Sequence, residues 1–430
     1  LGPGRRLRLG EARVTSDFAS VSGFNIQAGE ADFTIEGDEL VFNAAFRIDE
    51  QRDVVASGQA DLQQQQVLLN NLQLRFEGQT WQLLQPATIT YGEQYRISNF
   101  LLYTDGQQIA VDGVIDLNGY QNLVITVENF EIATVADLLG YEGLAGTLNG
   151  SLVMTGPASD PVAEGTIFID VIAKAEEIGD GRIDLHYEDR QVTIGAFLTN
   201  TMGGTLTVEG YIPINLALAP SDSAITTNGS VIGQGLDLQA EMAPPTSGVN
   251  LTVIANAFSI AWVEPFLPPE DYQDLDGILN ADLLITGTLD EPVLEGQWTL
   301  AEGNLYLPQI GISLRNMNGT GTMTGNQIIV NRANIRSGSG SLVAEGVINL
   351  QRLTLGEFDI TTSLDQFTAM DTEDFQHVVV SGQLDLQGTT DLPYVTGNAR
   401  VIGADIYLDN LLGADTLGQV SLTQQDLDEL

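Results

Sequence analysis

The side chains that perform most enzyme chemistry are scarce in this chain. There are two histidines, His186 and His377, which lie far apart in unlike sequence contexts. There are no cysteines, which excludes disulfides, thiol nucleophiles and zinc sites built on cysteine. A catalytic triad or a histidine-based metal site needs such groups in close proximity. We therefore interpret both histidines as ordinary strand or loop residues.

Carboxylates, in contrast, are abundant, with 58 acidic residues against 16 basic ones. Close pairs of carboxylates must therefore occur by chance. The cluster Asp371-Thr372-Glu373-Asp374 is interpreted as the acidic start of a short helix, where negative charge is favourable, with a weak cation site as the alternative. The glycine pairs near Gly203 and Gly338 lack the Lys-Ser/Thr that follows in a phosphate-binding loop. The chain is thus predicted to be no enzyme, to use no cofactor and to hold no metal.

The formal net charge of −42 also limits the partners. Such a surface repels phosphate backbones, so no nucleic acid is expected, and it does not favour attachment to an anionic membrane by charge alone. We interpret it as a solvated acidic exterior, with an acidic strip that docks a basic partner as the alternative. No stretch approaches the roughly 20 apolar residues of a membrane-spanning helix. Because the chain does not begin with Met, we expect a fragment of a longer protein.

The most regular pattern is an alternating apolar stretch with a glycine at its centre. The stretches run over 54–62, 109–117, 206–214, 342–350 and 378–386, around Gly58, Gly113, Gly210, Gly346 and Gly382. A period of two indicates strands, and recurrence indicates a repeat architecture. Each glycine falls on the apolar face, where it marks a bend, a bulge or a close backbone approach. We predict that these glycines are structural and that the sheet curls where they lie.

A second motif, Gly-x4-Pro-x3-Gly, defines the repeating unit. It occurs at 156–165, 287–296 and 388–397, with each proline in a polar turn. Short helices are expected before the copies, over 132–139, 260–267 and 367–375. The predicted divisions are a diverged β-rich region over 1–129, repeat units over 130–257 and 258–366, and a truncated third unit over 367–430.

The predicted fold is therefore all-β. It is an elongated sheet built from repeats that curls into a trough, with a few short helices at the repeat junctions. One face of the sheet is apolar and the other polar. The residues predicted to line the groove are Ile109, Val111, Ile115, Leu117, Leu148, Leu152, Met154, Leu206, Val208, Ile212, Ile214, Leu279, Leu283, Ile285, Leu342, Ile348, Leu350, Leu384 and Leu386.

The order of these motifs resembles that of the TamB and AsmA-like family of bacterial envelope proteins. The likeness is carried by Leu275-Asp-Gly277, by Gly287 through Pro292 to Gly296, by 303–307, and by the closing stretch 337–350. The stretch 130–216 resembles a second, diverged copy, and 367–408 begins a third.

The resemblance implies an elongated β-helix-like groove, U-shaped in section (a β-taco). It implies that this chain is a segment of such a hydrophobic β-groove that spans the periplasm, with the parent protein anchored in the inner membrane. It implies phospholipid acyl chains as ligands, shuttled between inner and outer membrane, and support of outer-membrane protein assembly with a TamA-type barrel partner. This chain is expected to be a middle section. Two alternatives stay open: a closed, secreted β-solenoid with a structural or adhesive role and no lipid, and a carbohydrate-active β-helix enzyme, for which no motif is found.

Overall fold

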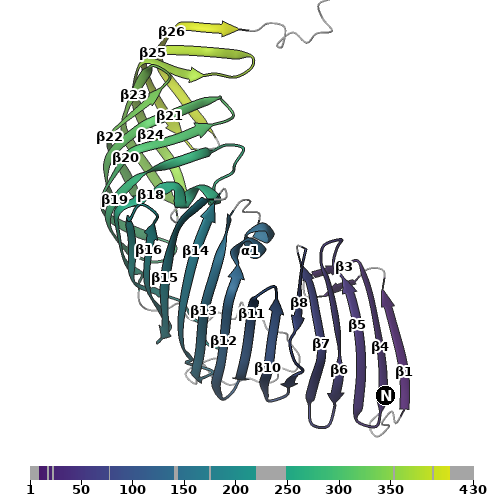
Figure 1. Ribbon diagram of the computed structural model, residues 1–430. Coiled ribbons are helices and arrows are strands. Elements are labelled where there is room, and N and C mark those ends of the chain that lie inside the picture. Colours follow the sequence, from purple (N-terminus) through teal and green to yellow (C-terminus); the bar gives the residue numbers. More distant parts are fainter. Residues whose placement is uncertain are drawn as a thin grey trace, which may run out of the picture. The chain divides into compact units, whose positions relative to one another are not determined.

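The structure is a computed structural model in which 78% of the described residues belong to β-strands (Figure 1). It describes residues 9–16, 19–21, 24–76, 78–139, 144–173, 176–218, 248–351, 354–389 and 392–406. One antiparallel sheet of 24 strands and a small hairpin, β2 with β3, contain the strands. The chain divides into two compact units, the first over 1–201 and 207–251 and the second over 202–206 and 252–430. The all-β prediction is confirmed.

The strands of the first unit follow one another up and down along the chain (Figure 1). They are β1 (Leu9–Ser16), β2 (Ala19–Val21), β3 (Phe24–Ile26), β4 (Ala28–Glu36), β5 (Glu39–Arg47), β6 (Asp53–Asp61), β7 (Gln66–Phe76), β8 (Gln79–Leu83), β9 (Ala87–Thr90), β10 (Gln94–Thr104), β11 (Gln107–Asp116), β12 (Tyr120–Glu131), β13 (Leu144–Pro157), β14 (Val162–Ala173), β15 (Glu176–Glu188) and β16 (Gln191–Asn200). Strand β17 (Thr205–Pro213) is divided between the two units.

Between β7 and β10 the place of one long strand is taken by two short ones. Strand β8 pairs with β7 and β10, and so does β9, at different positions along both neighbours. The break follows Leu84 and contains Pro86, whose missing N–H cannot serve a central ladder. The sheet is therefore interrupted at this point while its hydrogen bonding continues on both sides.

The second unit repeats the up-and-down order. Its strands are β18 (Asn250–Ser259), β19 (Gln273–Gly287), β20 (Pro292–Leu307), β21 (Ile312–Gly325), β22 (Gln327–Ser337), β23 (Gly340–Gln351), β24 (Thr354–Met370), β25 (Phe375–Gly388) and β26 (Pro393–Ile406). Strands that are not sequence neighbours also touch, since β24 contacts both β21 and β22. At that place Ile312, Leu364, Phe367 and Val380 form a buried cluster, and the Asp371 N–H donates to the Ile310 carbonyl at 2.9 Å. The sheet of this unit is thus curved enough to bring one of its edges back upon itself.

The Gly-x4-Pro motif forms three equivalent hairpin turns. Each first glycine ends a strand with a positive φ, which is +85° at Gly156, +91° at Gly287 and +113° at Gly388. The chain then turns, and the next strand begins at or directly after the proline, at β14, β20 and β26. The last two turns are also closed by a threonine hydroxyl that accepts the N–H three residues later, at 3.0 and 3.3 Å. The prediction of a proline turn is confirmed.

Two of the three predicted helices exist. The helix α1 (Ile132–Leu139) follows β12, and η2 (Ile260–Phe266), a 3-10 helix that contains Pro265, follows β18. The prediction of a helix over 367–375 is wrong. Phe367, Thr368 and Met370 pair with β25 at the end of β24, because burial of Phe367 against Leu364 and Ile312 holds this segment in the sheet. Residues 371–374 form a turn instead of an acidic helix start, and Asp371 Oδ1 accepts the N–H of His377 at 3.1 Å.

β-Bulges recur at one position of the pattern. Opposite the residue that precedes a glycine, the neighbouring strand carries one extra residue. This arrangement is found in the pairs β10–β11, β12–β13, β20–β21, β22–β23 and β24–β25, at Gly113, Gly150, Gly319, Gly346 and Gly382. Gly58 also adjoins a register shift, there with the extra residue on β7. Because a bulge bends its strand and increases the local twist, these positions are where the sheet acquires curvature.

Four of these five bulges have a common hydrogen bond; among the described contacts, the bulge of β22–β23 is the exception. The extra residue adopts a left-handed conformation, and its N–H donates to the side chain that precedes the glycine on the next strand. Asn129 (φ +51°) donates to Asn149 Oδ1 at 2.8 Å, and Gln366 (φ +49°) donates to Ser381 Oγ at 2.8 Å. Two similar bonds join Asn99 to Asp112 and Glu302 to Asn318, and Ala257 donates in the same way to Asn280, which precedes an alanine. At these bends the N–H that leaves the regular ladder is therefore satisfied.

Candidate functional site

The strongest candidate site is the apolar face of the sheet. In the first unit, apolar side chains on neighbouring strands stand in register across β12 to β16. One such row is Ile125–Leu152–Gly165–Leu185–Ile194, and the next is Val127–Gly150–Ile167–Ile183–Ala196. Most of these side chains are only half-buried, and Leu152 is 37% exposed. A closed core would bury them, so within the described residues this face is an apolar surface open to solvent.

The corresponding face of the second unit is more enclosed. Leu283 stands opposite Gly296, Ile285 opposite Leu294, and Ile348 between Ile328 and Phe358. Trp298 lies over Gly319 and Gly321 of β21, because an added Cβ would be 3.2 Å from the ring at Gly319 and 2.6 Å at Gly321. Leu342 and Leu384 pack against the buried cluster around Ile312. This face is a mixture of packed core and half-buried surface.

The predicted lining residues therefore fall on strands that present an apolar face, except for two residues that lie just beyond a strand end. Leu117 lies just after β11, and Ile214 just after β17. Leu350 is buried, and the rest are half-buried except Leu152. Whether a ligand touches any of them stays a prediction.

A pocket of about 370 Å³ opens on the apolar face of the first unit. Its wall is largely aromatic and aliphatic, made by Ile48, Val54, Leu74, Phe76, Trp81, Leu102, Ile109 and Phe130, and it is completed by Arg52, Asp53 and Arg75. Trp81 and Phe130 contact each other with ring centroids 5.7 Å apart. The volume lies in the range of about 300–1,000 Å³ that is usual for small-molecule sites.

The ionic groups at this pocket are paired. Arg52 binds Asp49 within the β5–β6 turn, and Arg75 binds Asp53 across β6 and β7. The hydrogen bond from the Arg52 guanidinium lowers the pKa of the Asp49 carboxyl, and N–H groups of Gln51 and Arg52 add to the effect. Both pairs are partly exposed to solvent.

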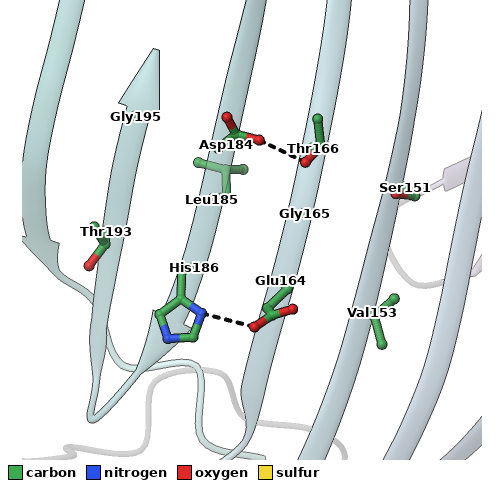
Figure 2. Close-up of a pocket in the computed structure, with 10 residues that line it drawn as sticks. All are labelled: Ser151, Val153, Glu164, Gly165, Thr166, Asp184, Leu185, His186, Thr193 and Gly195. Carbon is green, nitrogen blue, oxygen red and sulfur yellow. Dashed lines mark hydrogen bonds and ion pairs between the residues drawn. The ribbon is translucent and has the colours of Figure 1, made fainter.

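A second hollow, of about 420 Å³, lies on the polar face of the same unit (Figure 2). His186 points toward Glu164 at 3.6 Å, and its other ring nitrogen is 3.4 Å from Glu188. Thr166 Oγ1 donates to Asp184 Oδ1 at 2.8 Å, and Arg182 also binds this carboxylate. Those two hydrogen bonds lower the pKa of Asp184, with that from Arg182 the larger.

This polar hollow has the residue types of a triad without its geometry. Thr193, His186 and Glu164 are cross-strand neighbours, but no hydrogen bond joins Thr193 to His186 among the described contacts. The side chains of His186 and Glu164 are 42% and 75% exposed, whereas general acid–base groups work in a desolvated, preorganised setting. The arrangement is a solvated polar ladder. His377, the other histidine, is more exposed than His186 and lies 3.7 Å from Asp405.

Neither a metal cluster nor a membrane helix is seen in the part of the chain that the structure describes. No three potential metal ligands come together there, and none of the helices there has the length and apolar content needed to cross a bilayer.

Two features of the face were not predicted. The pocket depends on aromatic residues with no sequence spacing in common, since Trp81 and Phe130 meet only through the pairing of β8, β10, β11 and β12. The bulge hydrogen bonds carry a local signal, because a side-chain oxygen precedes the glycine in Asp112-Gly113, Asn149-Gly150, Asn318-Gly319 and Ser381-Gly382.

A repeated antiparallel sheet with one apolar face and no assembled catalytic or metal centre in its described residues defines a β-repeat binding or scaffold protein. The comparisons give the family. A model of the TamB N-terminal domain matches residues 10–300, and a model of the TamB C-terminal domain matches residues 330–428. The chain therefore belongs to the TamB family, which consists of non-enzymatic proteins of the periplasm and cell envelope, and the predicted resemblance is confirmed. Comparison with curated proteins and with solved structures gives no match.

Proposed function

We propose that this chain carries phospholipids along its apolar face, as a segment of a path between the inner and the outer membrane. The observation that supports this proposal is the half-buried apolar face of the first unit, in which side chains such as Leu152, Leu185 and Ile194 stand in register across strands. A surface of this kind is costly in water unless something apolar covers it.

The mechanism needs no reacting side chain. Each CH2 group transferred from water to the apolar face contributes about 0.8 kcal/mol, and the charged head group stays at the wet border of the sheet. Because consecutive strands offer nearly equivalent apolar surface, a chain can move from one strand to the next without crossing water. Direction comes from the two membranes or from their machinery. The parent protein is proposed to be anchored in the inner membrane, with an outer-membrane barrel of the TamA type as partner in outer-membrane protein assembly.

Strand β23 offers a test with a built-in control. Ile348 lies on the apolar face, and Val347 and Glu345 lie on the other face of the same strand. A photoreactive amino acid at Ile348 should capture phospholipid in cells, and the same residue at Val347 or Glu345 should not. Ile348→Asp should abolish lipid transfer between vesicles, whereas Val347→Asp should leave it largely intact. Equal labelling from both faces would refute the proposal.

The alternative, a structural β-solenoid without lipid, is separated by mass spectrometry of the gently purified chain. Phospholipid that co-purifies in stoichiometric amount supports the groove. If no phospholipid co-purifies with the chain, the structural role is supported instead.

A further inference from the structure

We infer that the pocket at Trp81 is a specific resting site for one phospholipid with a zwitterionic head group, with an acyl chain in the pocket and the head group at the ion pair of Arg52 and Asp49 beside it. This inference rests on the proposed lipid-carrying function and adds a fixed place and a head-group chemistry to it.

The pocket has the shape and chemistry for one end of a long hydrocarbon chain. Its floor is the row Val54–Leu74–Trp81, which is in register across β6, β7 and β8. Its far wall is formed by Leu102, Ile109 and Phe130. Trp81 is 5% exposed and Leu102 8%, so the floor and the far wall each contain a well-packed apolar side chain. An apolar cavity of about 370 Å³ favours an apolar occupant over water, which needs polar partners.

A polar border runs along the edge of the sheet at the same place. The turn after β5, the turn between β10 and β11 and the end of β12 lie at this edge, according to the strand pairing. Gln107 is 2% exposed; its Oε1 accepts the N–H of Glu131 at 2.9 Å, and its Nε2 donates to Gln79 at 3.3 Å. Gln79 in turn donates to Glu131. Gln79 and Gln107 precede Trp81 and Ile109 by two residues, so they stand on the same face of their strands. The border is therefore a built hydrogen-bonding rim, directly adjoining the apolar floor.

The charges at the pocket balance. Arg52 supplies a positive group, and its partner Asp49 supplies a negative one. The other pair at the pocket, Arg75 with Asp53, alternates with Leu74 and Val54 along its strands and therefore lies on the opposite face of the sheet. In a chain of net charge −42 with only 16 basic residues, an arginine beside an apolar pocket is a local departure. A phosphate can bind the guanidinium group of Arg52 through paired N–H donors, and an ammonium can bind the Asp49 carboxylate that is released. An anionic head group has no group to bind that carboxylate, and the negative field of the whole chain repels it. The site therefore favours a zwitterionic phospholipid.

The three tryptophans of the chain allow a direct test on the full chain. One variant, Trp262→Phe with Trp298→Phe, retains Trp81 in the pocket. The matched variant, Trp81→Phe with Trp262→Phe, retains Trp298 on the apolar face of the second unit. Each is titrated with vesicles of a phosphatidylcholine whose acyl chain is brominated, which quenches indole fluorescence on contact. We expect Trp81 to be quenched saturably and at lower lipid concentration than Trp298.

The head-group part is tested in the variant that retains Trp81. Arg52→Gln should raise the lipid concentration at half quenching about tenfold, the loss of roughly one charge-assisted hydrogen bond. Arg182→Gln, which removes an ion-paired arginine from the polar face of the same unit, is the control and should change nothing. A brominated phosphatidylglycerol should bind more weakly than the phosphatidylcholine.

The outcomes separate this site from the general function. Quenching of Trp298 without quenching of Trp81 would overturn the pocket and leave the lipid-carrying face standing. Equal affinity for the anionic lipid, or no effect of Arg52→Gln, would overturn the assignment of the head group. Failure of both tryptophans to respond would refute the lipid-carrying function itself.

Discussion

At the scale of single residues, the bends of the sheet depend on a small hydrogen-bonded unit. A residue with positive φ bulges out of one strand, and its N–H donates to the Asp, Asn or Ser that precedes a glycine on the next strand. The capping side chain satisfies the donor that the bulge removes from the ladder. The glycine beside it lets the next carbonyl approach closely, since an added Cβ would be 1.9 Å from the Asn122 oxygen at Gly113 and 2.2 Å from the Asp359 oxygen at Gly346.

Removal of one cap should weaken one bend. Asn149→Ala deletes the acceptor of the Asn129 N–H and should lower the free energy of unfolding by about 0.5–1.5 kcal/mol. Asn122→Ala, an exposed asparagine on β12 with no such bond among the described contacts, is the control and should cost less than half as much. The measurement is equilibrium denaturation by urea. Equal effects of the two changes would show that the cap adds no stability.

A side chain at a repeat glycine should be far more costly. In Gly346→Val the new Cβ collides with the backbone of β24, which cannot move without breaking its own ladder. The expected loss is about 3 kcal/mol or more, of the kind seen on overpacking, with lower lipid capture on the same strand. Gly195 of β16 has nothing within 4 Å of its added Cβ, so Gly195→Val should be tolerated. If the thermal midpoint is unchanged in Gly346→Val, this glycine has no structural role.

At the scale of strands and turns, the sequence predicts what is periodic. The alternation, the proline turns and the helices at 132–139 and 260–267 are all local patterns, and the structure contains them. The prediction of a helix over 367–375 was wrong, because Phe367 packs against Ile312, which is distant in sequence. The lining residues follow from the period of two, but the pocket wall does not, because it needs the split strand β8–β9 and the approach of Phe130. The spacing of residues in the sequence predicts neither the split strand nor the position of Phe130.

The left-handed bulge residues give a prediction at this scale. Glu302 has φ +55° within β20, a conformation that costs an L-residue about 1–2 kcal/mol. Glu302→Gly should therefore stabilise the second unit by up to about 1 kcal/mol, after the greater entropy of the unfolded chain is subtracted. Thr299→Gly, at an exposed position of the same strand without positive φ, should destabilise it by about 0.5–1 kcal/mol. Two destabilising results would mean that the bulge does not store this strain.

At the scale of the whole molecule, the chain separates two surfaces of opposite character. Apolar residues gather on one side of the strands, while the carboxylates, which give the net charge of −42, occupy the other side, the turns and the strand ends. The arginines are used mainly to hold carboxylates, as in Arg13 with Asp32 and Arg182 with Asp184. The few positive charges therefore do little to reduce repulsion among the remaining acidic groups.

Salt should consequently stabilise this protein. The screening length falls from about 30 Å at 0.01 M to about 10 Å at 0.1 M ionic strength, so repulsion between carboxylates on neighbouring strands weakens while the local Arg–Asp pairs lose little. We expect the thermal midpoint at pH 7 to rise steadily as sodium chloride is increased over this range, and to rise further at higher concentration. Scanning calorimetry measures this directly, with sucrose at matched osmolality as the control for general exclusion effects. A midpoint that falls with salt would mean that favourable ion pairs outweigh repulsion. In that case the acidic surface would be a stabilising network, and the arginine pairs beside the Trp81 pocket would be part of it.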